Sequence, residues 1–157
     1  YETIADSGGP GLHRGGNGLS MGYQFLEPGE ISIHDDRWLT YPWGVNGGLP
    51  GARSNKLMVR ANGSSEWMAS KCDRVKVEPG DTLYFNTWGG GGWGDPLDRD
   101  PAMVLSDVRD DKVSMTHATE AYGVVLDDSA TQVDTTATER LRRSMRSTRG
   151  DGARRTT

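Results

Sequence analysis

Glycine constrains this chain more than any other residue type, because it occurs 22 times in 157 residues and gathers in short tracts. Residues 7–18 read SGGPGLHRGGNG and residues 89–94 read GGGGWG. Ordering glycine costs more backbone entropy than ordering any other residue, so neither tract suits a helix or an ordinary strand. A glycine run inside a patterned sequence indicates that another backbone or a ligand approaches closely. We therefore expect ordered loops, in which at least one glycine of residues 89–94 has a positive φ or no room for a Cβ.

Alternating apolar residues after the first glycine tract predict strands. The alternation runs through residues 19–27 and resumes at 31–33 after a Pro-Gly turn. This arrangement predicts that the two segments pair as an antiparallel hairpin. Residues 34–54 contain prolines, glycines and several aromatic side chains, which is typical of a loop stiffened by packed rings.

Further strands are predicted in the middle of the chain. Residues 56–61 and 74–77 alternate in hydrophobicity, and Asn62-Gly63 is a strong hairpin-turn signal. Residues 81–88 carry bulky side chains on both faces, which is typical of a central strand. The indoles of Trp88 and Trp93 bracket the second glycine tract, and we expect them to pack it against the sheet.

Helical signals appear only in the last third of the chain. Asp100 followed by Pro101 suits a helix start, with the aspartate as N-cap. Ser114 is a second candidate N-cap, for a short helix that ends near residue 120. Residues 135–145 form an amphipathic third helix.

Strands first and helices afterwards predict an α+β fold. We expect one domain over residues 1–146, β-rich over 1–95 with long ordered loops, and helical over 100–146. Residues 147–157 are expected to be a disordered basic tail, because Arg, Gly and Thr side chains leave little to bury. Arginines crowd this end of the chain, at Arg140, Arg142, Arg143, Arg146, Arg149, Arg154 and Arg155.

Charge and hydropathy exclude several classes of protein. The net charge is −4 and almost all acidic residues precede the arginine-rich end, so the acidic body disfavours nucleic acid. No apolar run reaches the roughly 20 residues of a membrane span, so no membrane partner is expected. One cysteine, Cys72, excludes an internal disulfide and indicates a cytoplasmic location. The chain begins at Tyr1 without a methionine, and we expect it to be part of a longer protein.

Two glycine motifs resemble phosphate-binding loops but fail on context. Residues 89–94 contain GxGxxG, yet Asp95-Pro96 follows where a dinucleotide fingerprint needs a helix. Gly11 to Gly16 has the spacing of a P-loop, but Asn17 stands where the lysine must be. We therefore expect no ATP site in this chain.

Candidate metal ligands and nucleophiles are equally weak. His34-Asp35-Asp36 offers imidazole and carboxylate groups, but neighbouring side chains diverge and rarely converge on one ion. Cys72 lacks the sequence context of a catalytic thiol. No catalytic residue, metal ligand or bound cofactor is assigned from these patterns.

Four stretches taken together resemble a known family. They are SGGPGLHRGG (7–16), ISIHDDRWLTYPWGVNGGLPGARS (31–54), SKCDRVKVEPGDTLYFNTWGGGGWGDPLDRDP (70–101) and VLSDVRDDKVSMTHATEAYGVVLD (104–127). They are similar to the carboxyl-terminal part of the hydantoinase B/oxoprolinase family, the B-type component of ATP-dependent hydantoinases. The resemblance covers about residues 2 to 145.

The resemblance implies an ATP-dependent hydrolase that opens cyclic amides such as hydantoin, N-methylhydantoin or 5-oxoproline. It implies ATP and a divalent metal in the parent complex, an amino-terminal part of the same subunit, a hydantoinase-A-like ATP-binding partner, and an oligomer. The family's metal-binding motifs lie in the amino-terminal half and match nothing here. We therefore expect this chain to be inactive by itself.

The resemblance maps onto the glycine loops residue by residue. The matching positions are Gly8, Gly9, Gly11, Arg14, Gly15, Gly16, Gly89, Gly90, Gly91, Gly92, Gly94 and Asp95. Glycine amides can bind an oxyanion or a phosphate, so these loops are candidates for contacting substrate. The alternative is that they are loops that pack subunits together.

Two other functions stay open from the sequence. One is a component of an ATP-dependent carboxylase of the acetone or acetophenone type, since such enzymes are relatives of the same family. The other is a non-catalytic structural subunit encoded as a short protein of its own.

Overall fold

The structure is a computed structural model that describes the backbone of residues 1–153 and the side chains of residues 1–149. The strands are β1 (Glu2–Thr3), β2 (Leu19–Gln24), β3 (Gly29–His34), β4 (Asn55–Val59), β5 (Ser65–Trp67), β6 (Lys71–Val77) and β7 (Thr82–Asn86). They are followed by a 3-10 helix η1 (Pro96–Asp98) and by helices α1 (Pro101–Arg109), α2 (Met115–Tyr122) and α3 (Thr135–Ala153). The predicted α+β order of strands and then helices is confirmed.

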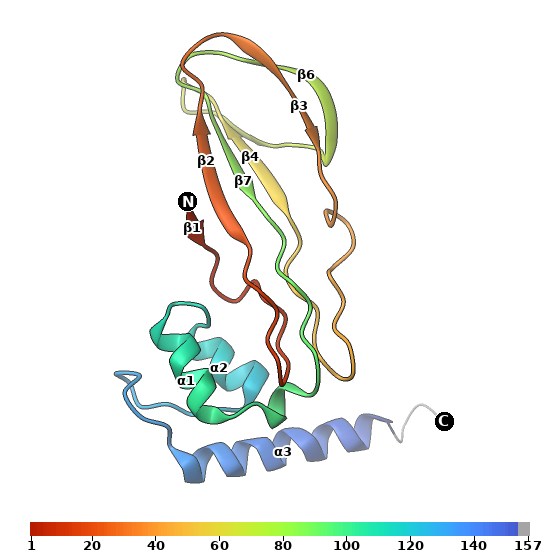
Figure 1. The fold of residues 1–157 in the computed structure, drawn as a ribbon, viewed down its shortest axis with the longest axis vertical. Coiled ribbons are helices and arrows are strands. Elements are labelled where there is room, and N and C mark those ends of the chain that lie inside the picture. The colour runs from red at the N-terminus through yellow and green to blue at the C-terminus, as the bar shows by residue number, and fades with distance from the viewer. Residues whose placement is uncertain (154–157) are drawn as a thin grey trace.

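The molecule is elongated, with the strands at one end and the helices at the other (Figure 1). Five strands form an antiparallel sheet in the order β1-β2-β7-β4-β5, and β3 and β6 form a separate two-stranded sheet. The predicted central position of β7 is confirmed, because it pairs with both β2 and β4. The hairpin predicted at Asn62-Gly63 is also confirmed, since β4 pairs with β5 across it.

The hairpin predicted between residues 19–27 and 31–33 is wrong. β2 pairs with β7, while β3 pairs with β6. A period-two pattern shows which side chains share a face but does not specify the neighbouring strand. Here the chain crosses from one sheet to the other between β2 and β3, so the Pro-Gly turn joins two sheets instead of two paired strands.

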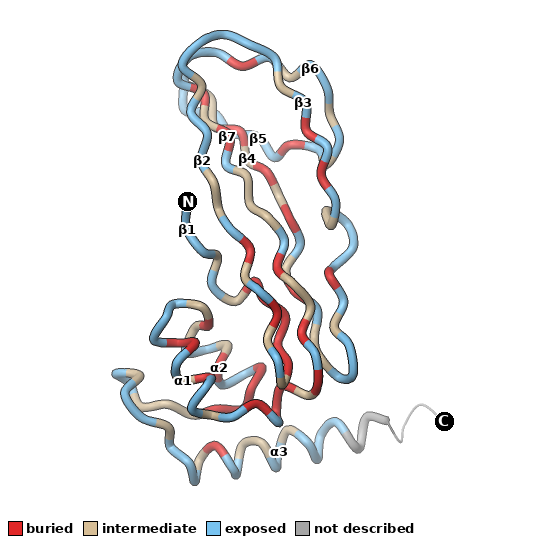
Figure 2. Tube along the Cα trace, viewed as in Figure 1, coloured by how far each residue is buried: buried red, intermediate tan, exposed pale blue. Residues whose placement is uncertain are grey.

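The two sheets enclose the first hydrophobic cluster. Tyr23, Leu83 and Met58 lie opposite one another on β2, β7 and β4, so their side chains share one face of the large sheet. The second sheet covers part of that face. The buried residues of this cluster are Ile33, Met58, Met68, Val77 and Leu83 (Figure 2).

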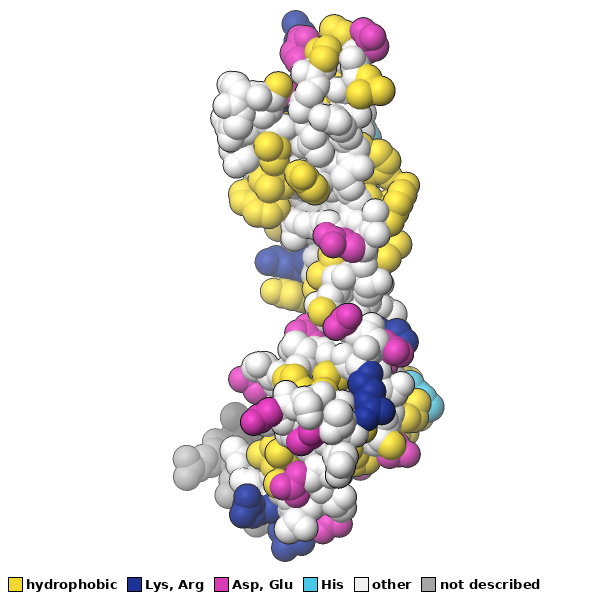
Figure 3. Space-filling model, turned by 90° about the vertical axis from the view of Figure 1, so that its left-hand side faces the viewer, with side chains coloured by type: hydrophobic (Ala, Val, Ile, Leu, Met, Phe, Trp, Pro, Cys, Tyr) yellow, Lys and Arg dark blue, Asp and Glu magenta, His cyan; other side chains and the backbone are white. Residues whose placement is uncertain are grey.

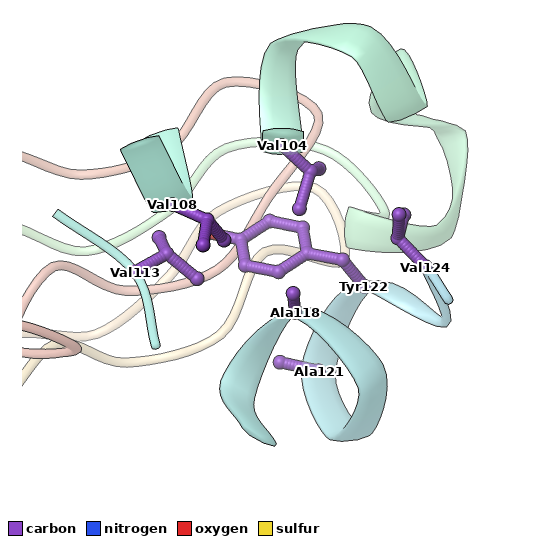
Figure 4. Close-up of a cluster of buried hydrophobic side chains, with 7 residues drawn as sticks. All are labelled: Val104, Val108, Val113, Ala118, Ala121, Tyr122 and Val124. Carbon is purple, nitrogen blue, oxygen red and sulfur yellow. The ribbon is translucent and has the colours of Figure 1, made fainter. Parts of the chain in front are cut away.

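The helical end has a second, separate cluster around Tyr122 (Figure 4). Its ring lies among small and branched side chains of α1, α2 and the segments that join them. The buried members are Val104, Val108, Val113, Ala118, Ala121, Tyr122 and Val124. Burial raises the pKa of the Tyr122 hydroxyl to about 12.

The two predicted N-caps are confirmed. The Asp100 carboxylate accepts a hydrogen bond from the backbone N–H of Ala102 at 2.9 Å, and the Ser114 hydroxyl accepts one from the N–H of His117 at 3.0 Å. Each satisfies a donor that the first turn of a helix leaves without a partner. α2 ends at Gly123, whose left-handed conformation (φ 61°) costs glycine nothing.

α3 is longer than the helix predicted over residues 135–145. It continues to Ala153, and the side chain of Arg149 still pairs with Asp95 at 3.0 Å. The predicted tail therefore begins inside this helix. The mobility expected of residues 147–157 stays a prediction, and residues 154–157 lie outside the described residues.

None of the helices within residues 1–153 combines the length and the apolar character that a membrane span requires. Many large hydrophobic side chains are nevertheless exposed, and Figure 3 shows several of them along the strand half of the molecule.

Candidate functional site

Three glycine-containing segments run side by side between the strands and the helices (Figure 1). They are residues 7–18, 42–52 and 89–94, and together we call them the glycine core. Each segment bonds to both of the others: the N–H of Gly90 donates to the carbonyl of Gly16, that of Gly92 to Leu49, and that of Leu49 to Pro10. Residues 7–18 and 89–94 were expected as ordered glycine loops, whereas residues 42–52 were expected only as part of a loop stiffened by packed aromatic rings.

The 42–52 segment carried a signal that could have been found. Residues 44–51 contain four glycines among other loop-forming residues. A Cβ added to Gly44, Gly48 or Gly51 would overlap a backbone carbonyl of a neighbouring segment or turn. Glycine is therefore required here by the approach of backbone, as in the two segments that the sequence singled out.

Five of the six backbone N–H groups of residues 89–94 donate to carbonyls inside the molecule, and that of Gly91 makes no such hydrogen bond within the described residues. Gly89 donates to Ala52 at 3.1 Å and Gly94 donates to Val45 at 2.9 Å. Trp93 and His13 exchange a pair of backbone hydrogen bonds, each 2.9 Å long. These amide donors already have partners, so they are not free to bind an oxyanion or a phosphate.

Side chains would not fit at the centre of the core. A Cβ on Gly89, Gly91 or Gly92 would overlap a backbone carbonyl oxygen, that of Ser7, Trp43 or Pro10 respectively. Gly94 has a φ of 74°, a conformation that favours glycine. The expectation of a positive φ or a missing Cβ site in residues 89–94 is confirmed.

The candidate glycines of the first segment lie in the same core. Gly9 and Gly15 use their N–H groups within it, on the carbonyls of Gly90 and Gly9. The N–H of Gly8 donates to the Asn17 side chain at 3.2 Å. Gly16 differs from the others, because an added Cβ there would meet no atom within 4 Å.

Arg14 connects the glycine core to the helical end. Its guanidinium donates to the carbonyl of Gly15 and to the Asn17 side chain, both at 2.7 Å. It also lies 3.5 Å from the carboxylate of Asp107 on α1, which pairs with Arg99 at 2.8 Å. All three charged side chains of this network are at least 86% buried. Arg14 is therefore held by its Nη1 hydrogen bonds and by its ion pair with Asp107, while its buried Nε has no hydrogen-bond partner within the described residues.

Asp95 ends the glycine core and begins η1. Its carboxylate accepts a hydrogen bond from the N–H of Leu97 at 2.9 Å, as an N-cap does. The same oxygen accepts one from Arg149 of α3. The structure thus brings all the candidate positions together where the strands meet the helices. The hydrogen bonds that these residues make there are with other residues of this chain.

The two tryptophans that bracket the second glycine tract are both about half exposed. The Trp93 ring contacts that of His13 in the first glycine segment, with ring centroids 5.5 Å apart and the two planes tilted by 41°. The packing expected of Trp88 and Trp93 against the sheet stays a prediction.

His34, Asp35 and Asp36 diverge to three separate partners. His34 lies 2.9 Å from Asp73, while Asp36 lies 3.7 Å from Lys71 on the surface. Asp35 is buried and pairs with Lys56. Within residues 1–149, no three His, Cys, Asp or Glu side chains gather so that they could hold a metal ion.

Lys56 is the most deeply buried charge in the strand half. Its ammonium group lies over the Phe85 ring, 3.8 Å from the centroid, beside the carboxylate of Asp35. Burial lowers the pKa of Lys56 to about 8. Because Asp35 follows β3 and Lys56 lies on β4, this pair connects the two sheets.

The hydantoinase B/oxoprolinase family matches residues 1–96, which include every candidate glycine. The B-type component of a putative D-/L-hydantoinase from a Pseudomonas species is 34% identical over 145 residues, covering 91% of this chain and 24% of that protein.

Two solved structures share the fold. The ATP-dependent caprolactamase of Pseudomonas jessenii superposes with a TM-score of 0.76 at 30% identity, over 90% of this chain and 25% of that one. A nucleotide-free acetone carboxylase superposes with a TM-score of 0.77 at 23% identity, over 94% and 24%. The chain spans about a quarter of the length of these proteins. It belongs to the hydantoinase B/oxoprolinase family.

Proposed function

We propose that this chain is the scaffold part of an ATP-dependent enzyme that opens cyclic amides, and that its glycine core is a packing element. The role of the glycine core as a packing element is supported by one observation: backbone N–H groups of the core donate to carbonyls of the core itself. The assignment to an enzyme that opens cyclic amides rests on family membership and on relatives named hydantoinase and caprolactamase. The substrate is a hydantoin, 5-oxoproline or a related lactam.

The chemistry of amide opening needs groups that these residues do not supply. Asn17 occupies the place of a phosphate-binding lysine, and the described side chains form no cluster suited to a divalent metal. ATP and the metal expected in the parent complex therefore do not fit the described part of this chain. We assign them to the rest of the subunit and to an ATP-binding partner.

We also propose that the chain acts together with other parts of a larger enzyme. Two relatives are named as the B-type component of a hydantoinase and the beta component of a caprolactamase, and each is about four times as long as this chain. We propose that the chain functions beside the remainder of a B-type subunit and a hydantoinase-A-like subunit, within an oligomer. The core then contributes rigidity at the place where strands, helices and the 42–52 loop meet.

Nucleotide hydrolysis by the whole complex tests this proposal. ADP release is measured with hydantoin, 5-oxoproline, caprolactam, or acetone plus bicarbonate as the second substrate. We expect stimulation by a cyclic amide, and none when the 157-residue chain replaces the complex. Stimulation by the ketone alone would assign the complex to the carboxylases, whose resemblance to this chain is so far one of fold. Turnover by the isolated chain would contradict its scaffold role.

A further inference from the structure

α3 docks on the molecule with little apolar burial. Ala137, Leu141 and Met145 are only half buried, and Thr138 is the one buried residue between 135 and 149. In proteins, most of the stability of a helix comes from tertiary contacts and not from its own propensity. Most of the contacts that dock α3 must therefore be of another kind.

Three arginines of α3 supply them. Arg142 donates to the carbonyls of Tyr122 at 3.0 Å and Arg99 at 2.7 Å. One turn further on, Arg146 donates to the carbonyl of Leu97 at 2.9 Å and the carboxylate of Asp98 at 2.8 Å. Arg149 reaches Asp95 at 3.0 Å. We call these three side chains the arginine clamp.

The carbonyls in the clamp are of one type. Tyr122 is the last residue of α2, and Leu97 and Arg99 lie at the end of η1. Carbonyls at the end of a helix have no partner within it, and a guanidinium there also compensates the negative end of the helix dipole. The clamp thus satisfies orphan acceptors of two short helices at once.

The clamp has an inner and an outer tier. Arg142 is half buried and makes both its bonds to carbonyls, which salt screens weakly. The ion pairs of Arg146 and Arg149 are exposed, with side chains 33–54% accessible. Exposed pairs contribute little and are screened at high salt.

We propose that α3 is a releasable strap: its last turns undock from η1 in a salt-dependent way while the strands and the glycine core stay folded. Release begins at the outer tier and ends with Arg142. It uncovers the carbonyls of Leu97 and Arg99, which follow the glycine core. The strap is thereby a device that exposes or covers these carbonyls according to the anions around it.

Hydrogen exchange of the full chain, followed by residue, tests the strap. Raising NaCl from about 50 mM to about 1 M should speed the exchange of amides 142–149 several-fold, with β7 unchanged. Arg142→Ala should speed the same amides by about tenfold at both salt concentrations. Arg146→Ala should speed them more at low salt than at high salt, because salt screens its ion pair with Asp98 but not its bond to the carbonyl of Leu97. Arg143→Ala, an exposed arginine of the same helix, is the matched control and should match the parent.

Two results would overturn the strap. One is that amides 142–149 exchange only together with β7, which means that α3 opens through global unfolding. The other is that neither salt nor Arg146→Ala alters them. Should Arg142→Ala fail to fold, the salt series on the parent chain and on Arg146→Ala decides between the outcomes.

Discussion

Glycines of this chain differ in whether a side chain has space. Gly91 and Gly92 lie against backbone carbonyls that belong to two other segments of the core. Gly16 lies in the same core but faces open space. Backbone atoms cannot move aside as a flexible side chain can. The loss of folding stability caused by an added methyl group therefore depends on whether it meets backbone or open space.

Gly91→Ala should lower the free energy of unfolding by about 1–3 kcal/mol, because the core must separate to admit the Cβ. Gly16→Ala should change it by less than about 0.5 kcal/mol. Thermal or urea unfolding of the two variants beside the parent provides the comparison. If Gly91→Ala melts with the parent, the close packing of the core is refuted.

The carboxylate of Asp81 is held by three hydrogen bonds. It accepts them from the N–H of Ala61 at 2.9 Å, from Arg60 at 2.9 Å and from the N–H of Glu78 at 3.1 Å. These bonds favour the ionised form and lower the pKa of Asp81. The unfolded chain therefore binds this proton more readily, and the bonds stabilise the fold above the ordinary carboxyl pKa of about 4.

This stabilisation should disappear as the pH falls through the folded-state pKa of Asp81. Urea midpoints between pH 7 and pH 3 should fall less steeply in Asp81→Asn than in the parent, since the amide does not titrate. Asp128→Asn, at an exposed carboxylate, serves as the control and should follow the parent curve. Parallel curves for parent and Asp81→Asn would show that Asp81 is not responsible.

At the scale of elements, the end of α2 and the docking of α3 depend on one another. Gly123 ends α2 with a positive φ, and a Cβ there would lie 2.9 Å from Arg142 and 3.0 Å from Met145. Gly63 also has a positive φ, in the β4–β5 turn, but a Cβ there would meet nothing. Comparing alanine substitutions at the two glycines therefore separates the destabilisation due to a positive φ from the destabilisation due to contact with α3.

Gly63→Ala should destabilise the chain by about 1 kcal/mol, through conformation alone. Gly123→Ala should cost at least about 1 kcal/mol more, because α3 must shift as well. Calorimetry on both variants gives the difference, and adding Arg142→Ala should reduce the excess at Gly123. Equal costs at the two glycines would mean that α3 is free to move away.

At the scale of the whole molecule, two hydrophobic clusters lie at opposite ends and share no residue. The glycine core and the network of Arg14, Asp107 and Arg99 lie between them. The network joins the first glycine segment to α1, and Arg99 also donates to the carbonyl of Leu12 at 2.9 Å. We expect the two ends of the molecule to unfold together as long as this network of ion pairs is intact.

Asp107→Asn should therefore destabilise the chain by about 3–5 kcal/mol, because two buried guanidinium groups lose their counter-charge. It should also split the unfolding transition seen by tryptophan fluorescence and by circular dichroism. Asp110→Asn removes an exposed pair with Lys112 and should change stability by less than about 1 kcal/mol. A single, unshifted transition for Asp107→Asn would refute the coupling.

Local chemistry in the sequence determined much of this fold. The N-caps at Asp100 and Ser114, the turn at Asn62-Gly63 and the central strand β7 were all predictable. Each depends on residues close together in the chain, where side-chain hydrogen bonds, allowed φ values and alternation act directly. The close approach of backbone to residues 89–94 was predictable for the same reason, since only glycine tolerates it.

Tertiary structure alone decided which segments meet. Alternation did not reveal that β2 pairs with β7 instead of β3, because a strand's pattern is the same whichever neighbour it has. The 42–52 segment joined the glycine core, and Arg142 and Arg146 of α3 docked at η1, through carbonyls that carry no sequence signal. Backbone acceptors are identical at every residue, so their partners are chosen by the positions that the folded chain gives them.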